Sequence, residues 1–300
     1  MSSPAVVAIV LNWNSGPDCL TCLAALARTD YAPLRVLVVD NGSTDGSVDA
    51  IRAAMPEVEV LELGVNCGYA AGNNRGIAWA LARGAQYVWI LNPDVLVDPA
   101  CLRTLIAGAD GVDRAGLLAP AVYFRESPDV LFSAGGVLRA GWAVHRGIGE
   151  RDTGQYAAPA EVDFLTGCAL LASRRMIEVA GGMDERFFLY AEDVEWSMRA
   201  RAAGFRVVAV PGARAWHPDT RRRDDCSARL TYYLARNHLM LIRMHHLGAA
   251  ALVRHLTRHA VTLLSWSVRP RWRYRRAQRD ALWRALMDFA RGRMGPAPDL

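Results

Sequence analysis

The chain contains no lysine, so all 35 of its Lys-plus-Arg positions are arginine. It also lacks any run of about 18 apolar residues, and its start has no basic region followed by a long apolar one. We therefore expect neither a transmembrane helix nor a signal peptide. Its 300 residues suffice for one large domain or two smaller ones with a sizeable core.

Glutamate is missing from the end of the chain. From Arg221 onward there are 17 arginines against five aspartates, a net charge of +12. Because the whole chain carries +5, the part before Arg221 carries −7. This uneven charge predicts a tail that meets an anionic surface.

The six cysteines are scattered and form no metal-binding pattern. Cys19 and Cys22 have CxxC spacing, but a zinc site needs a second pair of ligands, which the sequence does not offer at a suitable spacing. We expect core thiols in a reducing cytosol.

The glycine-rich turn over residues 66–74 matches neither common phosphate-binding fingerprint. It lacks the Gly-Lys-Ser/Thr of a Walker loop, and it follows the third predicted strand instead of the first. Gly68, Gly72 and Gly76 recur every four residues. This spacing allows close helix packing, and backbone amides at a helix start can equally bind phosphate or ribose.

Strand and helix patterns alternate along the first third of the chain. This alternation predicts a mostly parallel sheet with right-handed crossovers. We expect strands over residues 6–11, 34–39, 58–63 and 87–91, with helices over 18–28, 47–55 and from about 74 to 83.

The second third is less regular, and its end turns helical. We expect a hairpin or flexible loop over residues 133–149 and a break at Gly167 within an apolar strand. The remaining expected elements are helices over 100–109, 191–203, 230–246 and 248–266, with strands over 117–124, 163–173 and 205–210.

One apolar strand, residues 87–91, stops at Asn92-Pro93-Asp94. Pro93 cannot continue a central strand, so Asp94 follows the carboxyl end of the strand. Open α/β sheets bind ligands at that edge. We interpret Asp94 as a ligand for a metal that holds a diphosphate; the alternative is a simple turn residue.

Asp40 ends another buried strand, close to Asn12 and Asn14 in the predicted sheet. Its carboxylate could accept hydrogen bonds from a base imide or a ribose hydroxyl. Alternatively, Asp40-Asn41-Gly42 only makes a turn.

Three acidic residues, Glu192, Asp193 and Glu195, lie near the first turn of the helix over 191–203. Complementation of the helix dipole explains acidic residues at this position in general. It does not explain the aromatic residues just before them, Phe187, Phe188 and Tyr190, which could exclude water around a catalytic carboxylate and raise its pKa.

The basic tail combines two patterns. Arg254 and Arg258, like Leu252 and Leu256, are four residues apart, which indicates an amphipathic helix with a cationic side. Residues 269–276 then interleave arginine with aromatic residues, which suits an anionic lipid headgroup region. It would also suit RNA, and the plain alternative is a solvated, packed helical tail.

Together, these segments resemble the family 2 glycosyltransferases of the inverting, GT-A-fold type, and most of all bacterial rhamnosyltransferase-like enzymes of cell-surface polysaccharide synthesis. The ordered set spans the first two-thirds of the chain, and the similarity fades past Asn237. The matching segments are Asn12-Trp13-Asn14, Val38 to Ser43, Asn66 to Asn73, Leu91 to Asp94, Gly182 to Glu185 with Phe187-Phe188, and Glu192 to Glu195.

The resemblance implies an α/β GT-A (Rossmann-like) fold over residues 1–225, with a mostly parallel central sheet flanked by helices. Residues 226–300 would form a basic amphipathic helical extension. Asp193 would be the general base, and Asp94 the metal-binding member of an Asp-x-Asp motif in which Asn92 replaces the first Asp. His217, an isolated histidine that is otherwise structural, would be a further metal ligand. The other implied contacts are Asn12, Asn14, Asp40, Asn41, Gly68, Gly72, Asn73 and Asn92 for the nucleotide sugar, and Glu192 and Tyr190 for the acceptor.

The activity that the resemblance implies is transfer of a sugar from a nucleotide-diphosphate donor, with rhamnose from its dTDP form as the expected case. Mg²⁺ or Mn²⁺ would be the cofactor, and a saccharide or lipid-linked saccharide would be the acceptor. We expect a cytoplasmic enzyme, peripheral on the inner face of the plasma membrane through its C-terminal helices, with no nucleic-acid partner and with a homodimer left open. The alternatives are a non-catalytic sugar-nucleotide-binding protein and a nucleotidyltransferase, although residues 12–16 lack the glycine-rich basic loop that the latter class normally has.

Overall fold

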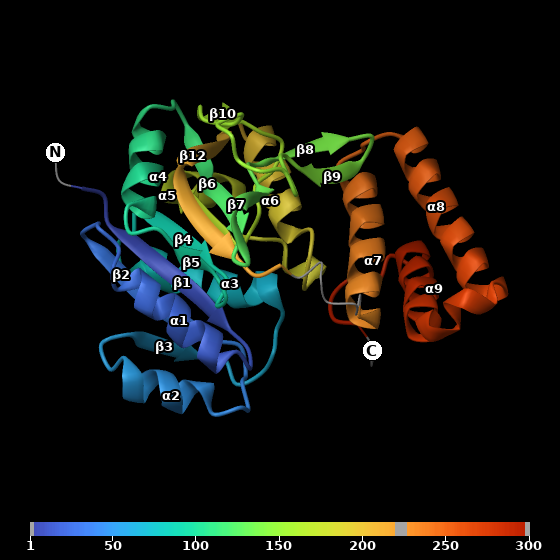
Figure 1. Ribbon diagram of the computed structural model, residues 1–300, viewed down its shortest axis with the longest axis horizontal. Helices are drawn as coiled ribbons and strands as arrows, with labels where there is room; N and C mark the ends of the chain where they lie inside the picture. Colours follow the sequence, from blue (N-terminus) through green and yellow to red (C-terminus); the bar gives the residue numbers. More distant parts are fainter. Residues whose placement is uncertain (1–2, 220–226, 298–300) are drawn as a thin grey trace.

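The computed structural model describes residues 3–219 and 227–297. A ten-stranded mixed sheet lies at the centre, helices flank it, and three further helices extend from one side (Figure 1). The main strand order is β10-β12-β6-β11-β4-β1-β2-β3, with β5 paired to β12 and β7 paired to β6.

The first third of the chain forms the parallel part of the sheet, as predicted. β1 pairs in parallel with both β2 and β4, and β2 pairs in parallel with β3. Every residue of β1 is buried because helices cover both faces, which explains its unbroken apolar run. The bounds are β1 Val6–Asn12, α1 Gly16–Leu26, β2 Leu34–Asp40, α2 Ser47–Ala54, β3 Glu59–Glu62, α3 Tyr69–Ala82 and β4 Tyr87–Leu91.

The second part makes the sheet mixed. β11 runs antiparallel between β4 and β6, whereas β12 runs parallel to β6. β12 continues past its predicted end at residue 210 to His217, with an irregularity between Val210 and Arg214 that carries the strand across Pro211 and Gly212. The bounds are β5 Leu96–Val97, α4 Cys101–Asp110, β6 Ala115–Phe124, β7 Ser127–Ser133, β10 Ala160–Glu161, β11 Ala169–Ser173, α5 Arg174–Ala180, η1 Glu185–Phe187, α6 Glu192–Ala202 and β12 Arg206–His217.

Residues 133–149 contain the expected hairpin, formed by β8 (Gly136–Arg139) and β9 (Trp142–His145). The predicted strand over 163–173 is regular only from Ala169, because the chain leaves strand geometry around Gly167. Short elements such as β7, β10 and α5 were not predicted. Of these, α5 begins at a Ser173 cap, whose hydroxyl accepts a hydrogen bond from the Met176 amide.

The C-terminal helices are α7 (Ala228–Met244), α8 (Ala249–Val268) and α9 (Arg276–Ala290), with the 3-10 helix η3 (Pro270–Arg275) before α9. α7 lies between the sheet part and the other two helices (Figure 1). Phe188 stacks on Tyr233 of α7 at 5.6 Å between ring centroids. On the other side, the Tyr232 hydroxyl donates to Asp288 of α9 at 2.7 Å. The expected boundary at residue 225 lies outside the described residues.

Within residues 3–219 and 227–297, no helix has both the length and the hydropathy that crossing a bilayer requires.

Candidate active site

Asp94 and Asp193 line the same cavity, which has a volume of about 590 Å³. Asp94 follows β4, and Asp193 lies in the first turn of α6. His217, at the end of β12, completes a third side. The cavity therefore lies beyond the carboxyl ends of the parallel strands, where the sequence placed the ligand site.

The Asp94 side of the cavity is suited to a divalent cation. Asp94 Oδ1 is buried and has no hydrogen-bond partner in the described structure, and it lies 3.5 Å from His217 Nε2. His217 Nδ1 lies 2.9 Å from the Pro218 carbonyl oxygen. A carbonyl oxygen only accepts, so Nδ1 is the donor in this contact, and the neutral ring then presents the Nε2 lone pair toward Asp94.

Two electron-pair donors that face each other fit a cation between them. Phe132 stacks on the His217 ring at 5.6 Å and fixes its plane. No group of three or more His, Cys, Asp or Glu side chains with metal-binding geometry occurs in the described part of the chain. The remaining ligands would have to be diphosphate oxygens or water, as is common for Mg²⁺.

Asp193 is half-buried and hydrogen-bonded. Its Oδ2 accepts from the Gly167 amide at 2.8 Å, and its Oδ1 accepts from the Val194 amide at 2.8 Å. Burial raises the pKa of Asp193, against the lowering effect of these two amides. A carboxylate of this kind is a stronger base than a free aspartate.

Glu192 adjoins Asp193 and lies in a more buried environment. Burial, and next the charge of Asp193, raise the pKa of Glu192 well above its ordinary value. Glu192 Oε2 is buried without a hydrogen-bond partner in the described structure. Two adjoining carboxyl groups do not ionise together readily. Asp193, which accepts two amide hydrogen bonds, is better placed than Glu192 to carry the charge.

The three residues before β11 join the two sides of the cavity. The Asn92 amide donates to the Cys168 carbonyl oxygen at 3.0 Å, next to the Gly167 amide that donates to Asp193. The Tyr69 hydroxyl donates to the Gly167 carbonyl oxygen at 2.8 Å. Thr166, Gly167 and Cys168 all line the cavity.

The backbone that leads to Asp193 has an unusual conformation. Phe188, Tyr190 and Ala191 have φ values of 62°, 67° and 70°. Such angles cost roughly 1–3 kcal/mol each for residues other than glycine and persist only when the surroundings hold them. Asn237 of α7 supplies that hold: its Nδ2 lies 3.0 Å from the Phe187, 2.9 Å from the Leu189 and 2.7 Å from the Tyr190 carbonyl oxygens.

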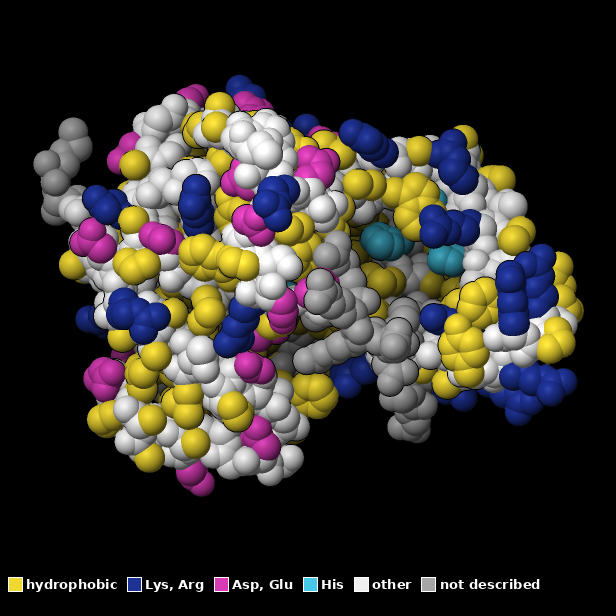
Figure 2. Space-filling model, viewed as in Figure 1, with side chains coloured by type: hydrophobic (Ala, Val, Ile, Leu, Met, Phe, Trp, Pro, Cys, Tyr) yellow, Lys and Arg dark blue, Asp and Glu magenta, His cyan; other side chains and the backbone are white. Residues whose placement is uncertain are grey.

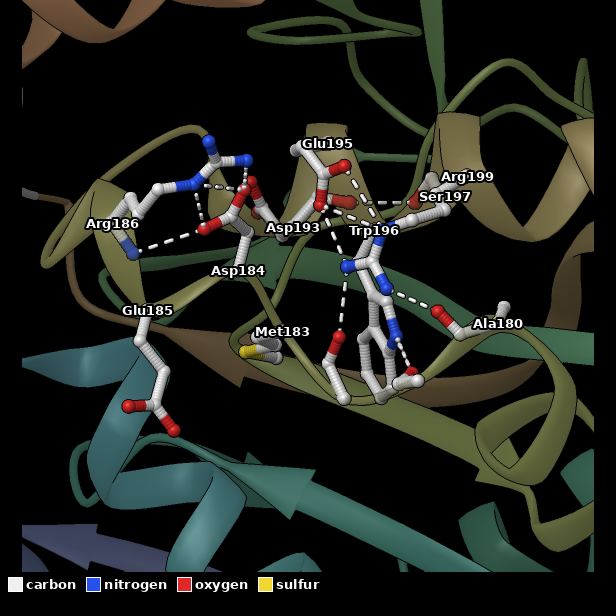
Figure 3. A network of polar contacts seen from close by, with 12 residues as sticks. Ala180, Met183, Asp184, Glu185, Arg186, Asp193, Glu195, Trp196, Ser197 and Arg199 are labelled. Atoms are coloured by element: carbon white, nitrogen blue, oxygen red, sulfur yellow. Dashed lines mark hydrogen bonds and ion pairs between the residues drawn. The ribbon is translucent and has the colours of Figure 1, made fainter.

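Residues 180–182, which lie earlier on the stretch that leads to Asp193, are hydrogen-bonded to α6 (Figure 3). Arg199 donates to the carbonyl oxygens of Ala180 and Gly182, and Trp196 Nε1 donates to the Gly181 carbonyl at 2.8 Å. Glu195 pairs with Arg199 at 2.8 Å. Although burial alone would raise the pKa of Glu195, the nearby His245, 3.4 Å away, and the hydrogen bonds from Arg199 outweigh it and lower the pKa. Glu195 is thus a charged structural partner, distinct from its neighbour Asp193.

Asn12 and Asp40 pair with each other below the cavity floor. Asn12 Nδ2 donates to Asp40 Oδ1 at 2.9 Å, and Asp40 Oδ2 accepts from the Ser43 amide at 3.0 Å. Asn14 Oδ1 accepts from the Thr44 amide at 2.8 Å. These contacts shape the turns after β1 and β2. None of the three lines the cavity, so their contact with a nucleotide stays a prediction.

The other expected nucleotide contacts divide into two groups. Asn41, Gly68 and Asn92 line the cavity, as do Glu192 and Tyr190, whereas Gly72 and Asn73 do not. A Cβ on Gly72 would lie 2.6 Å from Leu11 Cδ1, so this glycine serves helix-to-sheet packing. Asn73 is buried and donates to the Tyr69 carbonyl oxygen at 3.0 Å.

Sequence reasoning missed several cavity residues. Trp13 and Arg229 line the cavity, with the Arg229 guanidinium carbon 5.2 Å from the Trp13 ring centroid. His145 also lines it, and burial lowers the pKa of His145 to about 4. Asn237, although outside the cavity lining, had a signal in the sequence: Arg236-Asn237 is a polar pair inside an apolar helix.

The comparisons with known proteins agree with this geometry. The family model described as "Glycosyl transferase family 2" matches residues 7–179. The chain belongs to glycosyl transferase family 2.

The similar proteins include rhamnosyltransferases. The chain is 32% identical over 232 residues to an N-acetylglucosaminyl-diphospho-decaprenol L-rhamnosyltransferase of Mycobacterium tuberculosis, covering 70% of this chain and 74% of the relative. It is 23% identical to a dTDP-rhamnosyl transferase of Shigella flexneri, covering 80% and 81% of the two chains. Among solved structures, a mannosyltransferase from Pyrobaculum calidifontis, in complex with GDP-Man and Mn²⁺, superposes with a TM-score of 0.61 at 18% identity, covering 96% of this chain and 88% of that one. The fold is therefore the GT-A fold of glycosyltransferases, with a C-terminal helical part.

The site geometry generates a prediction for Asn237. Replacing Asn237 by Ala removes the side-chain amide that contacts three backbone carbonyl oxygens and loosens the strained backbone before Asp193. We expect kcat to fall about 10- to 100-fold, the equivalent of a lost buried hydrogen-bonding group of 1–3 kcal/mol, with little change in donor KM. Steady-state kinetics with a nucleotide sugar that supports transfer measure both constants.

Asn74 offers a matched control, because its side chain also hydrogen-bonds to the backbone. It donates to the Met183 carbonyl oxygen and accepts from the Met183 amide. Asn74→Ala should lower the melting temperature while kcat stays near the unsubstituted value. Equal kcat losses in both variants would mean that Asn237 only stabilises the fold.

Proposed function

We propose that this chain is an inverting glycosyltransferase that moves rhamnose from dTDP-rhamnose to a lipid-linked saccharide acceptor. The observation that carries the proposal is the shared cavity of Asp94 and Asp193. Its volume, about 590 Å³, is in the range of small-molecule sites. The relatives named above support the choice of donor and acceptor.

Asp193 has the role of general base. In the proposed reaction it removes the proton of the acceptor hydroxyl while that oxygen forms a bond to the anomeric carbon. The bond from the anomeric carbon to the diphosphate oxygen breaks on the opposite side, and the nucleoside diphosphate leaves with the electron pair. A single displacement of this kind inverts the anomeric centre.

Asp94 and His217 would hold the divalent cation, Mg²⁺ or Mn²⁺. When bound, such a cation offsets the charge that develops on the diphosphate oxygens. Arg229 lines the same cavity and adds a fixed positive charge. Asn41, Gly68 and Asn92 are the lining residues that we assign to the nucleotide sugar, and Glu192 and Tyr190 those that we assign to the acceptor.

We further propose that residues 1–225 form the catalytic part and that the enzyme works at the inner face of the plasma membrane. The lipid-linked acceptor and the basic C-terminal extension support this location. A non-catalytic sugar-nucleotide-binding protein remains the competing proposal, since it would need the same cavity but no base.

The base assignment predicts a contrast between two neighbouring carboxyl groups. Asp193→Asn should lower kcat by roughly 10²–10⁴-fold, because an amide cannot take the proton. Glu192→Gln should keep most of the activity, because glutamine resembles the protonated acid. Comparable losses of kcat in the two variants would show that the assignment of Asp193 as the base is wrong.

The raised pKa of Asp193 also predicts the pH dependence. The base is active when ionised, so kcat/KM should fall as the pH drops through a pKa above that of an ordinary aspartate. Because the acidic limb is assigned to Asp193, Glu192→Gln should leave it in place. If kcat/KM instead falls at the pKa of an ordinary aspartate, burial does not raise the pKa of Asp193.

The donor and the metal are tested together by thermal stabilisation. A panel of nucleotide sugars, each with and without Mn²⁺, should show the largest rise in melting temperature for dTDP-rhamnose with Mn²⁺; a ligand at 100 times its Kd adds about 2.7 kcal/mol. Asp94→Asn should remove the Mn²⁺-dependent part of the shift. Stabilisation without any turnover would favour the binding-protein alternative.

A further inference from the structure

α8 has one long side that is apolar and exposed. Val253, Val261, Leu264 and Val268 are 61%, 61%, 64% and 64% exposed. Their spacings of eight, three and four residues place them on one side of a helix. Exposed small or uncharged residues fill the spaces between them. We call this side the apolar face of α8; it also includes Thr257, Ala260 and Ser267.

The fold does not need this face, because α8 already packs through its other side. His255 is fully buried and stacks on Trp142 at 3.7 Å between ring centroids. Leu252 and Leu256 join a cluster with Phe289 of α9. An exposed apolar stripe along a helix of 20 residues is therefore available for an external contact.

Arginines border the apolar face. Arg254 and Arg258 lie along one of its edges, and η3 continues from its end with further arginines and the exposed Tyr274. In Figure 2, arginines gather over α8 and α9, whereas the sheet part carries both acidic side chains and arginines. In residues 227–297 the acidic side chains are Asp280 and Asp288, and Asp288 is buried.

This charge pattern selects one kind of partner. A second copy of the chain on the same face would bring arginine against arginine, with little acidic surface to compensate. An anionic lipid surface offers both an apolar layer and negative headgroups. The described helices cannot cross a bilayer, so contact parallel to the surface is the remaining geometry.

We propose that the apolar face of α8 inserts into the interface of an anionic membrane, with the bordering arginines at the headgroups. This proposal rests on the proposed function for its purpose, which is to bring the cavity to a lipid-linked acceptor. α7 separates α8 from the cavity, so the membrane contact and the reacting groups do not overlap.

The test uses the full chain and vesicles of phosphatidylglycerol and phosphatidylcholine at about three to seven. A double variant, Val261→Asp with Leu264→Asp, places two charges on the apolar face. We expect its vesicle binding in flotation assays to fall at least about 10-fold, whereas the unsubstituted chain binds these vesicles and binds pure phosphatidylcholine weakly. Removing α9 instead would not be informative, because α9 packs on α7 through buried Leu282 and Phe289.

The matched control is Val179→Asp. Val179 of α5 is 62% exposed, almost the same as Val261, but lies on the sheet part. This variant should bind vesicles like the unsubstituted chain. Val268→Asp provides a second probe of the face should the double variant have a lower melting temperature. Full vesicle binding by the face variants, or equal loss in the control, would overturn the proposal.

Two further readouts separate this proposal from the function. Transfer to a water-soluble, short-chain acceptor should be unchanged in the double variant, whereas transfer to an acceptor embedded in vesicles should drop. Vesicle binding without any transfer would refute the function and leave the membrane face standing. If light scattering shows a dimer that the double variant dissociates, while vesicle binding is unaffected, the face is a self-interface and the proposal is wrong.

Discussion

The short segment Thr166-Gly167-Cys168 is the constraint on which the cavity depends. Its Gly167 amide donates to Asp193, and its Cys168 carbonyl accepts from Asn92 beside Asp94. Asp94 and Asp193 come from distant parts of the chain. Their relative position is fixed because the same short stretch of backbone bonds to Asp193 and to Asn92, close to Asp94. A side chain on Gly167 would crowd Tyr69, since a Cβ there would lie 3.1 Å from the Tyr69 hydroxyl oxygen. A larger residue would therefore require Tyr69 to shift by a few tenths of an ångström, and the break in the strand at Gly167 is part of the site.

The sequence predicted the parts of this arrangement that depend on local chemistry. Pro93 had to end β4, so Asp94 had to follow a strand, and the first four strands had to be parallel because helices connect them. The aromatic residues before Asp193 indicated burial, and Phe187 and Phe188 are buried, whereas Tyr190 is 38% exposed. These features follow from residue type and neighbour spacing alone.

What sequence reasoning missed depends on contacts between distant segments. Nothing near Gly167 showed that β11 would run antiparallel beside β4, and so the amide that holds Asp193 was not foreseen. Asp40 and Asn12 were interpreted as ligand contacts because both follow strands. In the folded chain Asn12 lies opposite Asp40, and Asn12 Nδ2 donates to the Asp40 carboxylate. A strand-end polar residue is equally suited to a ligand and to its neighbour, so a nucleotide contact at these two residues stays a prediction.

The helical tail is more closely joined to the active site than a division near residue 225 suggests. Asn237 of α7 bonds to the backbone that positions Asp193, and Arg236 bonds to the Tyr232 hydroxyl, which in turn donates to Asp288 of α9. α7 therefore makes buried polar contacts on both of its sides. If the helix shifted, buried polar groups on both sides would lose their hydrogen-bond partners. A rigid helix held in this way fixes the distance from α8 to the cavity. If α8 lies in a membrane interface as proposed, this fixed distance would set the height at which Asp193 meets the acceptor hydroxyl.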